Sequence, residues 1–365
     1  MEKTKFKNDN VSMLGFGTMR FPIKDGAINK VKSYSMMDYA FDQGVNYIDT
    51  AWFYNDFKSE QFVGEYLSTK DRDTYYLATK LPIVLCKSEE DVLSFFNKQL
   101  LNLKVEYFDY YLVHALNKER FIQLKDFNVI NILLDLKKQG KIKHIGFSFH
   151  DDYECFEQIV SYFDWDFVQI QLNYMDVNHQ QGIKGLELLN SLEIPAIIME
   201  PIKGGKLANF NAEINNLFEI ESKDSSVASW AFRWVASQKG ILTVLSGMTK
   251  LEQVVDNINT FTDFMPMKTK EYNFIESVSV DIKEKQINIC TKCNYCMPCE
   301  FGVNIPASLG VQNDEAMYGS GAVVKMREHL IGKEAFADMC TKCDECIPKC
   351  PQQIDIPSMM EMISQ

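Results

Sequence analysis

The sequence has too little positive charge for a protein that works mainly on nucleic acid. Its 365 residues include 38 Lys and Arg against 50 Asp and Glu, which gives a formal net charge of -12. Proteins bind phosphate backbones through basic surfaces, so this balance argues against nucleic acid as a partner. The sequence also lacks a long polybasic run, so nothing indicates binding to an anionic membrane surface.

Long apolar runs are missing as well. No stretch approaches the roughly 18 consecutive apolar residues of a membrane span, and the amino terminus, MEKTKFKNDN, lacks the apolar core of a secretory signal. The sequence therefore predicts a cytoplasmic chain without a membrane span. In a reducing compartment, closely spaced cysteines are expected to be metal ligands rather than disulfide partners.

Between residue 11 and about residue 250 the chain alternates short apolar runs with amphipathic segments. This rhythm and length favour an α/β fold of the (β/α)8 TIM-barrel type. A doubly wound open sheet is the alternative, but no G-x-G-x-x-G follows the first run. The runs expected to be strands are 11–16, 45–49, 75–80, 108–114, 142–148, 167–171, 196–200 and 241–246.

The alternation stops near residue 265, and a cysteine-rich region begins at Cys290. We therefore expect a barrel domain at 1–268 and a small, mainly helical, ferredoxin-like domain at 269–365. Eight of the 10 cysteines lie in two copies of one pattern, CTKCNYCMPC from Cys290 and CTKCDECIPKCP from Cys340, which align with a shift of 50 residues. The other two, Cys86 and Cys155, stand alone and are expected to be ordinary buried side chains.

The second copy has the spacing C-x2-C-x2-C-x3-C-P, which is typical of [4Fe-4S] ligation in which the fourth cysteine binds the other cluster. The first copy departs from it, because Glu300 stands where proline is usual and two residues precede the last cysteine. Structural zinc, which also uses C-x2-C pairs, is the alternative. The pattern predicts two 4Fe-4S clusters, one on Cys290, Cys293, Cys296 and Cys350, and the other on Cys340, Cys343, Cys346 and Cys299.

Polar side chains stand at the carboxyl ends of most predicted strands, which is where (β/α)8 enzymes carry their chemistry. Each of them has a structural explanation when taken singly, such as a turn residue or a solvated strand end. Because they occur together at the ends of successive strands, we expect them to form one functional site. These residues are Asp49, Lys80, His114, Ser148, Gln169, Asn173, Glu200 and Ser246.

A set of longer segments occurs in order over the first 260 residues: NYIDTAWFY, Ser59-Glu60, LATKLP, YYLVH, IGFSFH, VQIQLNY, IMEPIKGGKL and VLSGMTKLEQVVDNI. In this combination the chain resembles the aldo-keto reductase family. With its cysteine-rich tail it is similar to the branch that carries a C-terminal ferredoxin-like 4Fe-4S domain. The resemblance implies an oxidoreductase that reduces a small-molecule carbonyl substrate with NAD(P)H.

The resemblance places the catalytic residues of the family on Asp49, Tyr54, Lys80 and His114. Reduction of a carbonyl requires a proton for the developing alkoxide, and a phenol with a pKa of about 10 releases one reluctantly at neutral pH. We expect Lys80 to lower the pKa of Tyr54 and Asp49 to hold Lys80 charged, while His114 orients the carbonyl oxygen. The structural alternative for Tyr54 is an aromatic residue lining the barrel rim.

The resemblance also implies a site for NADP(H) or NAD(H), with Lys250 as the cation for a 2′-phosphate. Two departures leave the cofactor open between NADPH, NADH and a flavin: Met199 replaces a stacking tyrosine, and Phe149 replaces an asparagine. The residues expected to bind the coenzyme are Ser148, Gln169, Asn173, Pro201, Gly204, Gly205, Ser246, Gly247, Thr249, Lys250, Gln253 and Asn257.

Two other functions stay open. A cluster passes one electron at a time and a nicotinamide two, so cluster-linked electron transfer would need a converter such as a flavin, and an electron-transfer protein as partner. A barrel that has lost catalysis and serves as an electron-transfer or docking module is the non-enzymatic alternative. The sequence carries no signal of the oligomeric state. Specificity is expected to come from Trp52, Phe53, Phe57, Phe149 and the segment 209–226.

Overall fold

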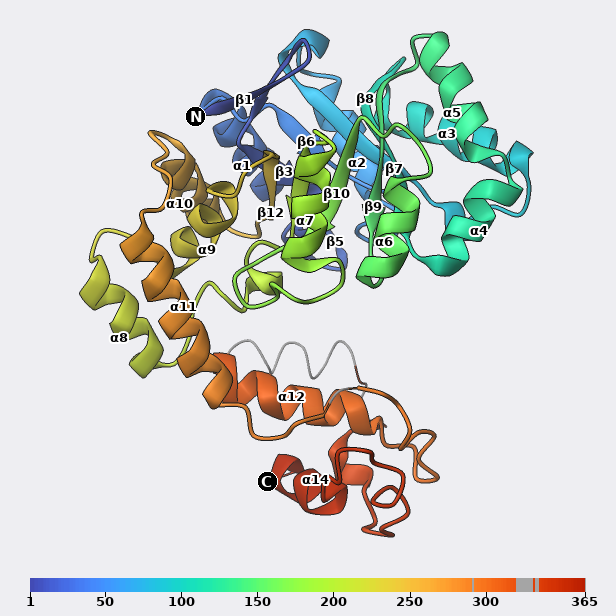
Figure 1. The fold of residues 1–365 in the computed structure, drawn as a ribbon. Helices are drawn as coiled ribbons and strands as arrows, with labels where there is room; N and C mark the ends of the chain where they lie inside the picture. Colours follow the sequence, from blue (N-terminus) through green and yellow to red (C-terminus); the bar gives the residue numbers. More distant parts are fainter. Residues whose placement is uncertain (291, 320–330, 332–334, 365) are drawn as a thin grey trace. The chain divides into compact units, whose positions relative to one another are not determined.

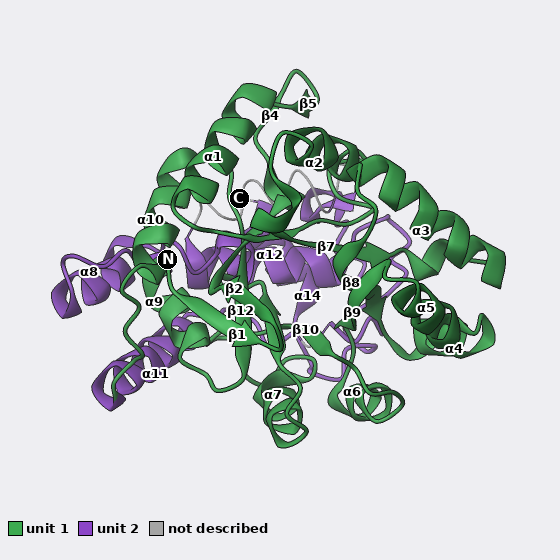
Figure 2. Cartoon of the chain, turned by 90° about the horizontal axis from the view of Figure 1, so that it is seen from above, with its two compact units in different colours: residues 1–202, 229–268 green, residues 203–228, 269–365 purple. Residues whose placement is uncertain are grey.

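The computed structural model describes residues 1–290, 292–319, 331 and 335–364 (Figure 1). The chain divides into two compact units (Figure 2). The barrel unit comprises Met1–Ile202 and Ser229–Lys268, and the cysteine unit comprises Lys203–Ala228 and Thr269–Gln365. Residues 203–228 are thus grouped with the cysteine-rich part of the chain rather than with the strands that flank them. The division into domains at 268/269 stays a prediction.

Eight parallel strands close into a barrel, which confirms the predicted (β/α)8 fold and excludes the open sheet. The strands were predictable because a parallel barrel buries both faces of each strand, so the strands have nearly continuous apolar sequences. In order around the barrel they are β10 (Phe167–Gln171), β11 (Ala196–Met199), β12 (Ile241–Gly247), β3 (Leu14–Gly17), β6 (Tyr47–Asp49), β7 (Tyr76–Leu81), β8 (Phe108–Leu116) and β9 (Ile142–Phe149).

Helices surround these strands (Figure 2). Helix α5 ends at Gln139-Gly140, since Gln139 is its C-cap and Gly140 takes a φ of 74°, which favours glycine. The helices of this part are α1 (Lys30–Asp42), α2 (Ser59–Leu67), α3 (Glu89–Leu103), α4 (Lys118–Asp126), α5 (Val129–Lys138), α6 (Tyr153–Val160), α7 (Gly182–Ser191), α9 (Val227–Ala236) and α10 (Leu251–Phe261).

An antiparallel hairpin, β1 (Lys3–Phe6) and β2 (Asp9–Ser12), precedes the barrel and was not predicted. The first predicted strand, 11–16, therefore began too early: Val11 pairs with Thr4 in the hairpin, and the barrel strand starts at Leu14. The hairpin strands are short and polar on one side, so they lack the apolar run that marks the barrel strands. A second short hairpin joins β4 (Ile23–Lys24) to β5 (Ala27–Ile28).

The cysteine unit is mainly helical where the structure describes it, as predicted. Its helices are α8 (Ala212–Glu221), α11 (Thr269–Glu284), α12 (Ile305–Tyr318) and α14 (Ile356–Ser364). The Ile-Pro pair that follows each cysteine pattern opens α12 and α14 respectively, because proline is tolerated in the first helical turn. A small apolar core that includes Leu309 and Met360 lies under six of the cysteines. No helix in the described part of the chain is long and apolar enough to span a membrane.

Candidate active site and cysteine pockets

A fully buried ammonium group lies where β6 and β7 end. Lys80 Nζ is 2.8 and 2.7 Å from the two carboxylate oxygens of Asp49, 2.9 Å from the carbonyl oxygen of Thr50, and 3.2 Å from Tyr54 Oη. Lys80 is 0% exposed and Asp49 2%. The structure thus brings three of the four predicted catalytic residues into one hydrogen-bonded group. The carbonyl of Thr50 is a partner that no sequence pattern indicated.

Tyr54 is aimed by a tight loop after β6. Its N–H donates to the carbonyl of Ala51 at 3.2 Å, and its own carbonyl accepts from Ser59 N at 3.2 Å. The three residues that follow, 55–57, all have left-handed φ values, of 51°, 53° and 66°. Such conformations cost about 1–3 kcal/mol for non-glycine residues and cluster at functional sites. The loop therefore stores backbone strain directly beside the phenol.

The pKa values of Lys80 and Tyr54 result from two opposing effects, which are burial and the interactions with the neighbouring charged or polar groups. Burial disfavours the charged form of Lys80, but Asp49 and Tyr54 outweigh this effect and raise the pKa of Lys80, so it stays an ammonium. Burial also raises the pKa of Tyr54, and the charge of Lys80 opposes this rise without cancelling it. Lys80 thus acts on the Tyr54 pKa in the expected direction, but burial outweighs it and the net pKa is raised. At neutral pH Tyr54 is protonated, which is the form a proton donor needs.

His114, at the end of β8, lies beside Tyr54. The two ring centroids are 6.3 Å apart at 83°, and the ring of Phe53 lies 5.7 Å from the imidazole. Burial, aided by the charge of Lys80, holds the pKa of His114 well below its ordinary value, so the imidazole is neutral. Among the described residues its Nδ1 has no hydrogen-bond partner. A neutral imidazole with an uncommitted nitrogen can hydrogen-bond a substrate oxygen.

A buried polar network supports β7 behind Lys80. Gln99 Nε2 donates to the Lys80 carbonyl at 3.0 Å and to Glu60 Oε1 at 2.5 Å, while Tyr111 Oη donates to Gln99 Oε1 at 2.7 Å. Thr79 Oγ1 also donates to Glu60 Oε1, at 2.7 Å. Burial raises the pKa of Glu60. Sequence reasoning missed Gln99, because a glutamine in an amphipathic helix carries no sign that it will be buried.

Ser148 on β9 and Gln169 on β10 are register partners in the barrel wall. Ser148 Oγ accepts from the N–H of Ala115 at 2.7 Å, which leaves its own hydrogen to donate. Gln169 Oε1 is buried and has no partner among the described residues, while Gln169 Nε2 lies 3.5 Å from Met199 Sδ. One free donor and one free acceptor side by side suit a carboxamide, so these residues fit a nicotinamide.

Two expected site residues have other contacts. Asn173 Oδ1 accepts from the N–H groups of Met175 and Asp176 at 3.1 and 3.0 Å, so this side chain shapes its own loop. Phe149 is 0% exposed and its ring centroid lies 4.9 Å from that of Phe156 on α6. It therefore packs in the layer between strand and helix, and the expectation that it lines the substrate loop is wrong.

The residues expected at the adenosine end surround the start of α10. Gln253 Oε1 accepts from Thr249 N at 2.8 Å and Lys250 N at 3.1 Å, so it caps the helix, and Lys250 stays exposed. Asn257 Nδ2 donates to Ser246 Oγ at 2.9 Å. Of the remaining candidates, Gly247 ends β12 and Pro201 follows β11 in the barrel unit, while Gly204 (φ 67°) and Gly205 (φ 103°) belong to the cysteine unit.

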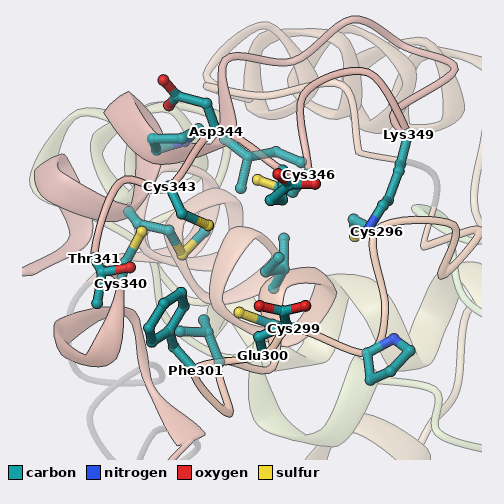
Figure 3. A pocket seen from close by; sticks show the side chains of 17 residues that line it. Cys296, Cys299, Glu300, Phe301, Cys340, Thr341, Cys343, Asp344, Cys346 and Lys349 are labelled. Carbon is teal, nitrogen blue, oxygen red and sulfur yellow. The ribbon is translucent and has the colours of Figure 1, made fainter.

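The cysteines of the two patterns line two pockets. Each pocket gathers the four cysteines of one predicted set, and Figure 3 shows the second pocket from close by. The first pocket is lined by Cys290, Cys293, Cys296 and Cys350 together with Pro306 and Leu309 of α12. The second is lined by Cys299, Cys340, Cys343 and Cys346, and Cys296 also borders it.

The repeat in the sequence is also a repeat in the backbone. Lys292 and Asn294 have φ values of 58° and 64°, and their counterparts 50 residues later, Lys342 and Asp344, have 58° and 63°. Left-handed residues turn a loop sharply and direct its N–H groups inward; Lys292 N lies 3.4 Å from Cys290 Sγ. Hydrogen bonds of this kind to sulfur tune iron-sulfur clusters.

Within the described residues, no three His, Cys, Asp or Glu side chains converge as ligands of one metal ion. A structural zinc ion would draw four ligands to about 2.0–2.3 Å from a single point. The thiols surround two pockets, and both cysteine patterns have the C-x2-C-x2-C spacing that is typical of [4Fe-4S] ligation.

A closed (β/α)8 barrel has a buried lysine and aspartate at its strand ends and a partly buried tyrosine in the loop beside them. With a domain whose two pockets are lined by eight cysteines, these features define an oxidoreductase with an iron-sulfur domain. The model of the aldo/keto reductase family matches residues 13–280, and the chain belongs to this family. The model of a 4Fe-4S dicluster domain matches residues 289–355. The predicted family and its iron-sulfur branch are confirmed, and the chain is an oxidoreductase that acts on CH–OH and C=O groups.

Similar proteins support this assignment. The chain is 25% identical over 293 residues to the NADH-specific methylglyoxal reductase of Escherichia coli, covering 68% of this chain and 89% of that relative. It is 23% identical over 295 residues to L-galactose dehydrogenase of Arabidopsis thaliana, covering 75% and 92%. An aldo-keto reductase from Bacillus halodurans aligns with a TM-score of 0.64 and 22% identity, covering 76% and 96%. One from Klebsiella pneumoniae in complex with NADPH gives 0.63 and 19%, covering 76% and 95%.

Proposed function

We propose that this protein reduces the carbonyl group of a small molecule with NADPH or NADH, and that Tyr54 donates the proton. The observation that carries the proposal is the hydrogen-bonded group of buried Asp49 and Lys80 with partly buried Tyr54, and neutral His114 beside it. A lysine with no exposed surface is costly to bury, so its presence at the barrel mouth needs a purpose beyond stability.

A bound nicotinamide coenzyme would supply a hydride to the carbonyl carbon. Tyr54 Oη gives its proton to the carbonyl oxygen as negative charge develops there, and water returns a proton to Tyr54 after turnover. The tyrosinate formed in between is stabilised by Lys80 Nζ, 3.2 Å away, and Asp49 keeps that ammonium in place. His114 orients the carbonyl oxygen with an N–H, because it is neutral and one ring nitrogen carries a hydrogen.

The coenzyme is held by the residues that the family resemblance assigns. The Ser148 hydroxyl and Gln169 Oε1 bind the carboxamide, and the exposed Lys250 at the start of α10 binds the adenosine phosphate. The backbone of Pro201, which follows β11 in the barrel unit, would approach the pyrophosphate. Both nicotinamide coenzymes occur among the similar proteins, since the E. coli relative is named NADH-specific and the Klebsiella structure contains NADPH.

We also propose that the cysteine unit binds two [4Fe-4S] clusters, one in each pocket. The support is the division of the cysteines between two pockets and the matching left-handed residues in the two loops. A bound cluster would supply a one-electron couple, whereas carbonyl reduction by hydride moves an electron pair. We therefore propose that the clusters carry no electrons during carbonyl reduction and have a structural or regulatory role.

Substitution of Tyr54 by phenylalanine tests the proposed function. We expect Tyr54→Phe to lower kcat for NADPH-linked carbonyl reduction at least about a hundredfold, because it removes the proton donor. Iron content and coenzyme affinity should stay unchanged. The matched control is Tyr76→Phe, which removes a phenol whose oxygen accepts from Asn10 N and which lies outside the catalytic group. Normal turnover in Tyr54→Phe would end the proposal.

One observation favours a second function, electron exchange with another protein. Cys293 of the first pocket and Cys343 of the second are exposed, so a cluster in either pocket would lie near the surface. Electron transfer between proteins needs such an approach. This alternative requires a flavin or similar converter in the barrel, and a visible spectrum without flavin bands after gentle anaerobic purification would count against it.

A further inference from the structure

The barrel wall is irregular beside His114. The pairing of β8 with β9 shifts at this point, so that two residues of β8, His114 and Ala115, stand opposite the single residue Ser148 of β9. Such a bulge redirects a side chain away from the regular alternation of a strand, and bulges are frequent next to active sites. The direction of the His114 imidazole therefore depends on what holds the bulge in place.

Ala115 has a backbone conformation that needs support. Its φ is 51°, in the left-handed region that residues other than glycine rarely adopt and that persists only where neighbouring groups hold it. Both polar groups of its backbone have side-chain partners. The N–H of Ala115 donates to Ser148 Oγ at 2.7 Å, and its carbonyl oxygen accepts from Arg120 Nη1 at 2.6 Å. Two side chains thus hold the bulge, one at each peptide group of Ala115.

Arg120 reaches the bulge from the first turn of α4, and this turn is itself held firmly. Asn117 caps the helix, since its Oδ1 accepts from Arg120 N at 2.9 Å. The next residue, Lys118, donates its N–H at 2.9 Å to Oδ2 of Asp151, which lies just after β9. The start of α4 is therefore fixed to the loop that follows the strand opposite the bulge, and the Arg120 side chain extends from a fixed point.

The charge of Arg120 is not used elsewhere in the described part of the chain. Its side chain is partly buried, forms no ion pair with any described residue, and donates to the carbonyl of Ala115. A hydrogen bond from a charged donor is stronger than one between neutral groups. Burial, and after it the charges of Lys80, His150 and Arg120, lowers the pKa of His114, so the guanidinium lies within electrostatic range of the imidazole.

We propose that Arg120 is a positioning residue for carbonyl reduction: it fixes the bulge at Ala115 and thereby holds His114 in the orientation that binds the carbonyl oxygen of the substrate. The proposal rests on the proposed function, because it takes His114 to be the residue that orients this oxygen. Arg120 acts through His114 and contacts neither the substrate nor the coenzyme. All the residues of this arrangement belong to the barrel unit.

The test compares Arg120→Met with Lys118→Met in intact, anaerobically purified protein. Both variants lose one positive charge from the first turn of α4, but Lys118 Nζ pairs with the exposed carboxylate of Asp152 and makes no contact with the bulge. We expect Arg120→Met to lower kcat for carbonyl reduction at least about tenfold, because a small displacement of His114 weakens its hold on the transition state. The KM for the carbonyl substrate should change less than kcat, and Lys118→Met should keep the wild-type kcat.

Two further measurements separate positioning from a general loss of structure. In a His114→Ala background, Arg120→Met should lower the remaining kcat by less than about twofold, because both changes remove the same interaction. Arg120→Lys keeps a charged donor without the planar fork and should recover part of the wild-type kcat. Hydrogen exchange followed by mass spectrometry reports the bulge itself: the peptide that contains Ala115 should exchange faster in Arg120→Met than in the wild type or in Lys118→Met.

Several results would overturn the proposal. An equal loss of kcat in Lys118→Met would reveal a general charge effect, and a full effect of Arg120→Met in the His114→Ala background would show that Arg120 acts on the substrate or the coenzyme directly. Unchanged exchange at Ala115 in Arg120→Met would contradict the support of the bulge.

The failure of this proposal can be told from a failure of the proposed function. A wild type that reduces no carbonyl compound would overturn both together, whereas an active wild type beside an equally active Arg120→Met overturns this proposal alone. If Arg120→Met does not fold, Arg120→Gln removes the same charge with a polar side chain, and a wild-type kcat in that variant would decide against the proposal.

Discussion

In the barrel unit the candidate catalytic side chains come from separate strands, with Asp49 on β6, Lys80 on β7 and His114 on β8, and they meet because these strands are neighbours in the barrel wall. In the cysteine unit the candidate ligands, the cysteines that line the two pockets, come from two short loops that repeat after 50 residues. In the first site Lys80 and Asp49 are buried and compensate each other's charge, whereas all eight cysteines of the second are partly or fully exposed. Loss of its partner should therefore destabilise the fold far more for a buried charge than for a cysteine on a surface loop.

The largest effect is expected from breaking the buried ion pair of the barrel. Lys80→Met leaves the Asp49 carboxylate buried without its cation, so it should lower the free energy of unfolding by about 3–5 kcal/mol. Urea denaturation measures this change. The double variant Asp49→Asn, Lys80→Met removes both charges and should recover most of the loss. If the single and the double variant were equally unstable, the loss of stability would not come from leaving the Asp49 carboxylate buried without its cation.

The next effect concerns the cysteine pockets, where one ligand should affect one cluster. Cys343→Ala is expected to lose about half of the iron and sulfide, because it opens the second pocket and leaves the first intact. The control is Cys86→Ala, a buried thiol whose pKa burial raises to about 12 and which lies outside both pockets. Loss of all the iron in Cys343→Ala, or of none, would contradict two separate sites.

The smallest effect is in the pH dependence of carbonyl reduction. Burial keeps the pKa of His114 well below its usual value and that of Tyr54 above it, so neither group should titrate between about pH 6.5 and 10. We expect kcat for reduction to be flat over this range and to fall only at higher pH, where Tyr54 loses its proton. An inflection near neutral pH, in initial rates at saturating substrate, would place a different group in the role of proton donor.

The two regions also differ in how far the sequence could predict them. The cysteine pattern is local, so its spacing alone predicted both sets of residues that line the pockets. The strands were predictable from their apolar runs, and the positions of Asp49, Lys80 and His114 at strand ends indicated a common site. Tyr54 lies in a loop, and only the family resemblance added it to this group. Gln99 was missed because its burial depends on how α3 packs against β7. Phe149 was misplaced because the alternation of faces along β9 decides which way it points.

The segment 203–228 shows a further limit of prediction from sequence. Its side chains contact α11 and α12 of the same compact unit, and the sequence carried no sign of these contacts. The contact between Lys206 and Asp314 joins residues more than 100 positions apart, and no spacing rule predicts such a pair. The contacts of this segment are therefore decided by tertiary packing rather than by the order of elements along the chain.

The most direct test of the central claim, that reduction takes place at Tyr54 without electrons passing through the clusters, is an anaerobic stopped-flow measurement. NADPH and a carbonyl substrate are mixed with the intact protein, and the absorbance of NADPH and of the clusters is followed together. The account predicts that NADPH is consumed in proportion to the alcohol formed while the cluster absorbance stays constant. Bleaching and recovery of the clusters at the rate of NADPH consumption would contradict it.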